Sequence, residues 1–285
     1  MRVLLEFFGD KLLAQVNGDL CRRYAAQRST DAAARRELED LRAAVNHYQH
    51  EGLMREKIGI WLPKRRPARE RWLMRAEAAR LVLSAWRYRE RQNGEATDRQ
   101  PRRHVARFIL VALYAGRRAG AITEAAFAPE PGRGWIDVGR GVFYPRSGMV
   151  QGKKRQPPIM LPRRLVAHLR RWKRNGQRYV IEWQGKPIGR MAKAFRHAAR
   201  AAGFGSDVTP HVLRHTSATW LMQRGADRWA AAGYLGMSME TLDRIYGHHH
   251  PDYQKTAWSV FDRPGGVPKP KTKTKLKTQK RRIVR

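Results

Sequence analysis

The sequence contains a single cysteine, Cys21, and few acidic residues for its length. One cysteine excludes an internal disulfide and a cysteine-rich zinc cluster within one chain. No apolar run approaches the ~20 residues that a membrane span needs. Residues 1–8 are too short for a signal peptide and run into the acidic Asp10. We therefore expect a cytoplasmic, reducing setting and no membrane partner.

Basic residues are in large excess, with 59 Lys and Arg against 24 Asp and Glu and a net charge of +35. Basic side chains displace condensed counterions from a phosphate backbone, so a nucleic acid is the simplest partner to infer. A solvated basic surface is the alternative interpretation. The 285 residues, of which 42% are hydrophobic, are sufficient for two globular domains or one large one.

Residues 209–251 hold the densest pattern of functional side chains. Thr209 followed by Pro210 predicts the start of a helix, because proline is well placed at the first helical position. His211 and Arg214 are three residues apart and share one face of that helix, and His215 lies one residue further round.

Two short helices are predicted next, over 229–235 and 239–246, and the second ends at Tyr246. The combination of HVLRH at 211–215, Leu-Gly at 235–236 and a tyrosine ten residues after that glycine resembles the C-terminal signature of tyrosine recombinases, the phage-integrase family.

An earlier stretch, AGRRAGAI at 115–122, resembles the first box of that family, T-G-x-R-x-x-E-[ILV], with Arg118 in the arginine position. It departs from the pattern at Ala115 and at Ala121, where an acidic residue is common. After Leu-Gly the family usually has His or Trp, whereas this chain has Met237 at that third-box position, where it offers packing but no strong hydrogen bond.

The resemblance implies strand cleavage through a covalent 3′-phosphotyrosine, with no metal and no cofactor. Two guanidinium groups suit the charge that develops on an attacked phosphodiester, and a tyrosine hydroxyl suits the attack. Lysine is expected in the turn of a basic hairpin at 145–162 to protonate the leaving 5′-hydroxyl, with Lys153 as the alternative to Lys154. The implied catalytic residues are Arg118, Lys154, His211, Arg214 and the nucleophile Tyr246.

Two further histidines, His215 and His248, are candidates for support of this site. The run His248, His249 and His250 also suggests a metal site. Three consecutive side chains do not converge on one ion from a helix, and no carboxylate pattern accompanies them, so we predict no metal.

The fold class expected is mainly α (α+β): a helical core-binding domain and a mostly helical catalytic domain with a small β-sheet or hairpin. Strands are predicted at 135–138, 142–144 and 179–183. The predicted boundaries are 1–61 for the core-binding domain, 62–73 for a basic linker, 74–262 for the catalytic domain and 263–285 for a disordered basic tail. The first domain is short for this family, so either this member is minimal or its N-terminus is truncated.

Double-stranded DNA carrying attachment sites is the expected partner, bound by a homotetramer near the bacterial nucleoid, with an accessory DNA-bending or directionality factor. The function expected is that of a prophage or mobile-element integrase. A catalytically impaired remnant that only binds DNA, a helix-turn-helix regulator and a type IB topoisomerase are the alternatives. The predicted DNA-binding residues are Arg22, Arg23, Arg35, Arg36, Lys64, Arg65, Arg66, Lys153 and Arg155.

Overall fold

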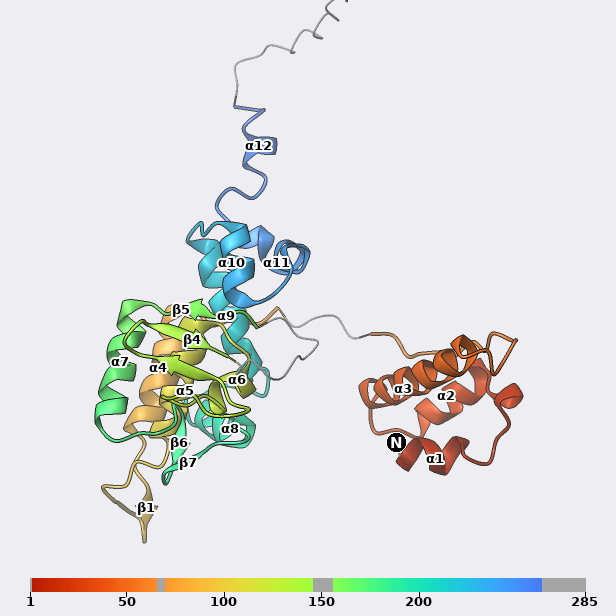
Figure 1. Ribbon diagram of the computed structural model, residues 1–285, viewed down its shortest axis with the longest axis horizontal. Helices are drawn as coiled ribbons and strands as arrows, with labels where there is room; N and C mark the ends of the chain where they lie inside the picture. The colour runs from red at the N-terminus through yellow and green to blue at the C-terminus, as the bar shows by residue number, and fades with distance from the viewer. Residues whose placement is uncertain (1, 66–69, 146–155, 263–285) are drawn as a thin grey trace, which may run out of the picture. The chain divides into compact units, whose positions relative to one another are not determined.

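The computed structural model describes residues 2–65, 70–145 and 156–262. The chain divides into two compact units, Met1–Arg69 and Glu70–Arg285 (Figure 1). Both are mainly helical, and the second also holds small antiparallel sheets, which confirms the predicted fold class. No helix in the described part of the chain is long and apolar enough to cross a membrane. The predicted tail at 263–285 lies outside the described residues.

The first unit is a small helical bundle. Asn17 and Thr30 cap two of its helices, each accepting a hydrogen bond from the backbone N–H three residues ahead. Its core holds Cys21, Tyr24 and Leu38, all at most 1% exposed. The elements are α1 (Arg2–Phe8), the 3₁₀ helix η1 (Leu13–Gln15), α2 (Gly18–Ala26) and α3 (Asp31–His50).

Helix α5 is the central element of the second unit. Eight of its thirteen residues are buried, and it packs against α4 and α9. Such a helix is apolar on most sides, which is the character of its sequence VARFILVALY at 105–114. The helices of this unit are α4 (Arg75–Arg87), α5 (Arg103–Ala115), α6 (Ala119–Thr123), α7 (Arg163–Arg174), α8 (Ala192–Ala201), α9 (Pro210–Gln223), α10 (Arg228–Leu235), α11 (Met239–Tyr246), η2 (Gly247–His249) and α12 (Lys255–Trp258).

The main sheet has three antiparallel strands in the order β3-β4-β5. Ile136 and Phe143 are directly paired across it and are both fully buried, so one face of the sheet closes the core beside α5 and α7. The strands are β3 (Trp135–Asp137), β4 (Val142–Tyr144) and β5 (Ile159–Met160), and two hairpins are formed by β1 (Arg91–Gln92) with β2 (Glu95–Ala96) and β6 (Glu182–Trp183) with β7 (Lys186–Pro187).

The predicted strand at 179–183 is wrong over its first half. Only Glu182 and Trp183 are in a strand, and Tyr179 makes an isolated bridge to Ala126. The Glu182 carboxylate accepts hydrogen bonds from the backbone N–H groups of Arg178 and Tyr179, both at 3.1 Å. These bonds close a local turn, which prevents an extended strand.

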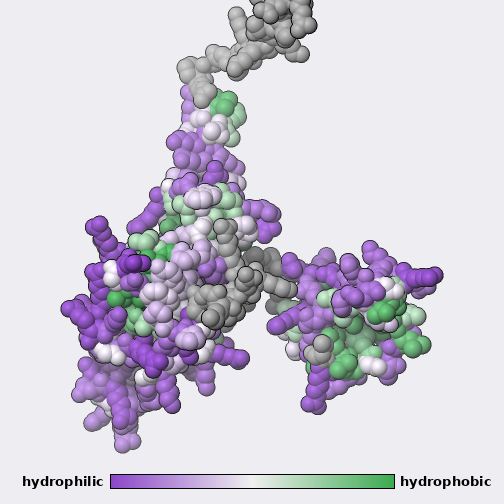
Figure 2. All heavy atoms as spheres, in the orientation of Figure 1, coloured by the Kyte–Doolittle hydropathy of each residue, from purple (hydrophilic) through white to green (hydrophobic). Residues whose placement is uncertain are grey.

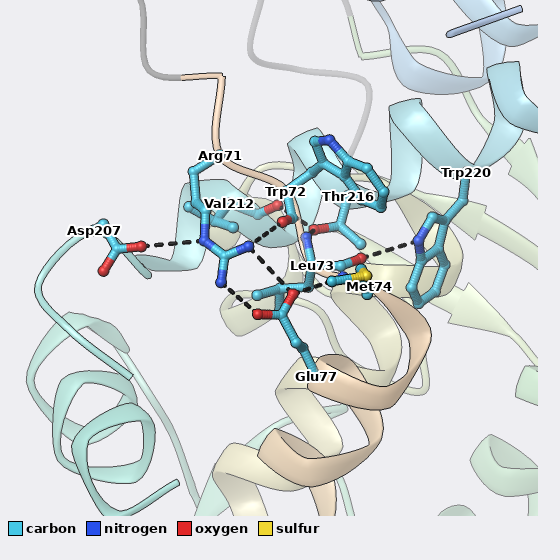
Figure 3. A network of polar contacts seen from close by, with 9 residues as sticks. All are labelled: Arg71, Trp72, Leu73, Met74, Glu77, Asp207, Val212, Thr216 and Trp220. Atoms are coloured by element: carbon cyan, nitrogen blue, oxygen red, sulfur yellow. Dashed lines mark hydrogen bonds and ion pairs between the residues drawn. The ribbon is translucent and has the colours of Figure 1, made fainter. Parts of the chain in front are cut away.

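Both ends of the predicted linker at 62–73 are packed. Leu62 contacts the core of the first unit, and Leu73 is fully buried in the second. The Leu73 N–H donates to the Thr216 hydroxyl at 2.9 Å, and its carbonyl accepts from the Trp220 indole at 3.1 Å (Figure 3). Arg71 binds Glu77 through two hydrogen bonds and also contacts Asp207. We call residues 71–74 the anchor segment, because they attach the chain to α9.

Candidate active site

Helix α9 carries three of the predicted site residues. Thr209 is its N-cap and Pro210 its first residue, as predicted, although the Thr209 side chain makes no capping hydrogen bond. Arg214 is 5% exposed, and its Nη1 donates to the Gly116 carbonyl at 2.7 Å. His211 lies one turn earlier, and its ring centroid is 4.6 Å from that of His215.

The loop between α5 and α6 supplies Arg118, which stands immediately before α6. Gly116 ends α5 with a φ of 59°, a left-handed conformation that favours glycine. A Cβ atom at Gly116 would lie 2.5 Å from Leu235 Cδ2 and 2.8 Å from Ser217 Oγ. Glycine is therefore required both for the turn and for the close approach of α9 and α10.

One cavity of about 600 Å³ brings Arg118, His211 and Arg214 together. Two further arginines, Arg117 and Arg190, also line it. Among the described residues that line this cavity, none carries a carboxylate side chain. Guanidinium groups gathered without counter-charges form a site for an oxyanion, because each binds two oxygens in a fixed planar geometry.

Tyr246 does not line this cavity and points to a different histidine. Its hydroxyl lies 2.7 Å from His215 Nδ1, and its side chain is 5% exposed at the end of α11. It packs in a cluster with Ala218, Met222 and Leu242. The imidazole next to the phenol is thus His215, whereas sequence reasoning gave proton movement to His211 and only a supporting role to His215.

Burial and neighbouring cations set the protonation of these groups. Burial raises the pKa of Tyr246 to about 12, and Arg214 acts in the opposite direction. Burial, aided by His211 and Arg214, lowers the pKa of His215 to about 4. Burial also lowers the pKa of His211, aided by Arg214 and Arg118. At neutral pH the phenol and both imidazoles are therefore uncharged.

The remaining predicted positions are arranged as follows. Met237 packs against the cluster that contains Tyr246, in keeping with a packing role at the third-box position. His248 is exposed, and its ring lies 4.0 Å from that of His249 rather than beside Tyr246. Within the described residues, no group of three or more His, Cys, Asp or Glu side chains is arranged to hold a metal ion. Lys153 and Lys154 lie outside the described residues.

Several predicted DNA-binding residues of the first unit have partners within the protein. Arg35 pairs with Glu39 at 3.0 Å and also donates to the Pro63 carbonyl. Arg23 pairs with Asp19 at 3.0 Å, and Arg65 approaches Glu39 at 3.6 Å. Exposed basic side chains remain at Arg22, Arg23, Arg36, Lys64 and Arg65, whereas Arg66 and Arg155 lie outside the described residues.

Sequence reasoning missed Arg117 and Arg190. Arg117 is only 3% exposed, although it occupies the variable position of the first box. The first-box pattern gives no role to that position. The presence of a second arginine directly before Arg118 is nevertheless a signal that could have indicated a further cation at the site. Arg190 is exposed and precedes α8, with no local pattern around it that indicates a site.

The fold of the chain is that of DNA recombinases. The Tn1549 transposon integrase, in complex with transposon right end DNA, superimposes with a TM-score of 0.66 at 13% identity over 92% of each chain. The XerH site-specific recombinase bound to its palindromic difH substrate gives a TM-score of 0.60 at 16% identity, over 92% of this chain and 77% of that one. At these identities the likeness shows a shared fold and nothing further about this chain.

Sequence comparisons match part of the chain to one family. Residues 135–252 match the Phage integrase family, so the chain carries a phage integrase family domain, which confirms the resemblance to tyrosine recombinases. Tyrosine recombinase XerD of Corynebacterium glutamicum is 34% identical over 80 residues, 27% of this chain and 26% of the relative. XerD of Staphylococcus saprophyticus is 37% identical over 70 residues, 24% of each chain. These matches span about a quarter of the length of the relatives.

Proposed function

We propose that this protein is a site-specific DNA recombinase, the integrase of a prophage or mobile element, which cuts and rejoins DNA through a 3′-phosphotyrosine. The observation that carries the proposal is the joint placement of Arg118, His211 and Arg214 on one carboxylate-free cavity, with Tyr246 on the neighbouring helix. The family domain and the recombinase fold support it.

In the proposed reaction the Tyr246 oxygen attacks the scissile phosphorus while the bond to the 5′ oxygen breaks. Arg118 and Arg214 bind the non-bridging oxygens and stabilise the charge of the transition state. The phenol proton passes to His215, whose Nδ1 lies 2.7 Å from the Tyr246 oxygen. A lysine, Lys154 or Lys153, donates a proton to the leaving 5′-hydroxyl. A 5′-hydroxyl that attacks the phosphotyrosine reverses these steps and restores the tyrosine, so strands are rejoined without ATP.

Tyr246 is buried in the chain as described, so we infer that DNA binding moves α11 before attack. Helix α11 belongs to a small group of elements, α9, α10, α11 and η2, that contact one another. We infer that the rearrangement within this group keeps the Tyr246 hydroxyl beside His215, so that their contact is still in place when attack begins. The negative charge of a bound phosphate attracts the cationic cavity side chains and favours this rearrangement.

The proposed assembly is a homotetramer on two DNA duplexes that carry attachment sites, with an accessory DNA-bending or directionality factor. Apolar side chains near the end of the described chain suit contact with a neighbouring copy: Trp258 is 52% exposed, Val260 60% and Phe261 90%. This segment, beside α12, shows an apolar patch in Figure 2. Helix α11, by contrast, packs on α9 and α10 of its own chain.

The deciding experiment uses nicked suicide DNA that carries the candidate attachment site from the protein's own genomic flank, in the presence of EDTA. We expect a protein–DNA adduct that survives denaturation and is lost in Tyr246→Phe. Tyr234→Phe is the matched control, because Tyr234 is a tyrosine on the adjacent helix α10 whose hydroxyl bonds the Tyr114 carbonyl. DNA binding without any adduct, at a site that a related integrase cleaves, would instead favour a DNA-binding remnant.

A further inference from the structure

Arg117 is an arginine that the family pattern leaves without a role. Its side chain is 3% exposed and lines the same cavity as Arg118 and Arg214. Nη2 donates to the Pro157 carbonyl at 2.7 Å, whereas Nε is buried and has no hydrogen-bond partner among the described residues. A buried donor without a partner is costly in a native protein and calls for an explanation.

The charge around Arg117 is unbalanced. No carboxylate forms an ion pair with it in the described part of the chain. The groups that act on its charge are the cations Arg214 and Arg118 and the phenol of Tyr234. Burial, followed by repulsion from Arg214, lowers the pKa of Arg117 to about 10. Ala121 stands at the position where the family commonly has an acid, so that position supplies no negative charge.

Buried cations that repel one another destabilise a folded protein unless an anion joins them. A phosphate in the cavity supplies that anion, because it carries the negative charge that the arginines lack and accepts hydrogen bonds from several donors at once. The repulsion between the buried arginines, which destabilises the free protein, thus strengthens the binding of phosphate.

We propose that Arg117 is a third guanidinium of the phosphate-binding cavity, which holds the oxyanion of a DNA phosphodiester together with Arg118 and Arg214. This inference rests on the proposed function, since it assigns the phosphate to the same cavity. The competing role is purely structural: Arg117 holds the Pro157 carbonyl in place and makes no contribution to anion binding.

Thermal unfolding of the full chain during titration with inorganic phosphate, at constant ionic strength, separates the two roles. We expect phosphate to raise the Tm of the wild type. Loss of one charge-assisted donor weakens apparent phosphate binding roughly tenfold in Arg117→Met. Arg117→Lys retains the charge and is expected to retain most of the response. Arg107→Met is the matched control, since Arg107 is half-buried, has an unpaired buried Nε and lies outside this cavity.

The Tm without phosphate gives a second readout. Removal of a repelled charge offsets the lost bond to Pro157, so we expect Arg117→Met to have a phosphate-free Tm close to that of the wild type. A lower phosphate-free Tm with an unchanged phosphate response in both Arg117 variants would overturn the inference and leave the structural role. If no adduct forms but the phosphate response depends on Arg117, cleavage is refuted and the anion site is retained. Failure of the proposed function and failure of this inference are therefore distinguishable.

Discussion

The hydroxyl of Tyr246 lies 2.7 Å from Nδ1 of His215, which stands on a different helix 31 residues earlier in the chain. Burial, aided by His211 and Arg214, lowers the pKa of His215, so its imidazole is uncharged at neutral pH. In the proposed reaction, this contact places the nucleophile beside the group that takes up its proton before DNA binds. The same contact joins α11 to α9 and therefore also fixes the position of Tyr246 in the free protein.

Replacement of His215 tests its part in proton transfer. We expect His215→Phe to slow single-turnover adduct formation by about 10²-fold to 10⁴-fold, the usual contribution of a general base. The measurement is the rate of adduct formation at saturating suicide DNA. His248→Phe is the control, because the exposed His248 ring has no contact with Tyr246, and it should leave the rate near that of the wild type. Equal losses in the two variants would contradict a specific role for His215.

The depressed pKa of His215 predicts acid sensitivity of the fold. The unfolded chain binds a proton near the ordinary pKa of 6.5, whereas the folded chain binds it only near 4. The contribution of His215 to the free energy of unfolding is therefore fully present above pH 6.5. It is lost as the pH falls from about 6.5 to 4, and this loss is about 3 kcal/mol at most. Urea unfolding at several pH values measures this slope. His215→Gln should flatten it.

Gly116 is expected to tolerate no side chain. Its positive φ already costs an alanine about 1 kcal/mol, and contacts with Leu235 and Ser217 add strain, for a total of about 2–4 kcal/mol. Gly176→Ala is the matched control, because Gly176 has a φ of 81° but no atom within 4 Å of the position that an alanine Cβ would occupy. Chemical denaturation gives both values. A similar loss at the two glycines would show that only the backbone angle matters.

The anchor segment predicts a measurable role for Thr216. Thr216→Val leaves the Leu73 N–H buried without a partner and should cost about 1–3 kcal/mol of unfolding free energy. Thr216→Ser retains the hydroxyl and should lose less. Thermal or urea unfolding provides the comparison. If Thr216→Val keeps the unfolding free energy of the wild type, or if only Thr216→Ser loses stability, the methyl packing of Thr216 matters and its hydrogen bond with Leu73 does not.

Local signals predicted much of the fold. The strands predicted at 135–138 and 142–144 form two strands of the main sheet. The helix predicted at 239–246 is also present, between Gly236, which ends the preceding helix, and Tyr246. Each of these signals acts over a few residues, which is the distance at which sequence is informative.

Such local signals could not predict the contacts between elements that are distant in the sequence. That His215 rather than His211 meets Tyr246 depends on how α9 and α11 pack, and that Arg117 is buried depends on the approach of Pro157. The strand predicted at 179–183 failed because the Glu182 side chain competes for backbone N–H groups, which periodicity does not report.

The anchor segment has a consequence for protein engineering. Leu73 is hydrogen bonded through both its N–H and its carbonyl to α9, the helix that carries His211 and Arg214 (Figure 3). A chimera that grafts a different N-terminal unit onto this catalytic unit should be joined before Arg71. A junction placed after Leu73 would replace the residues that hydrogen bond to α9, and it would therefore change the support of His211 and Arg214 together with the N-terminal unit.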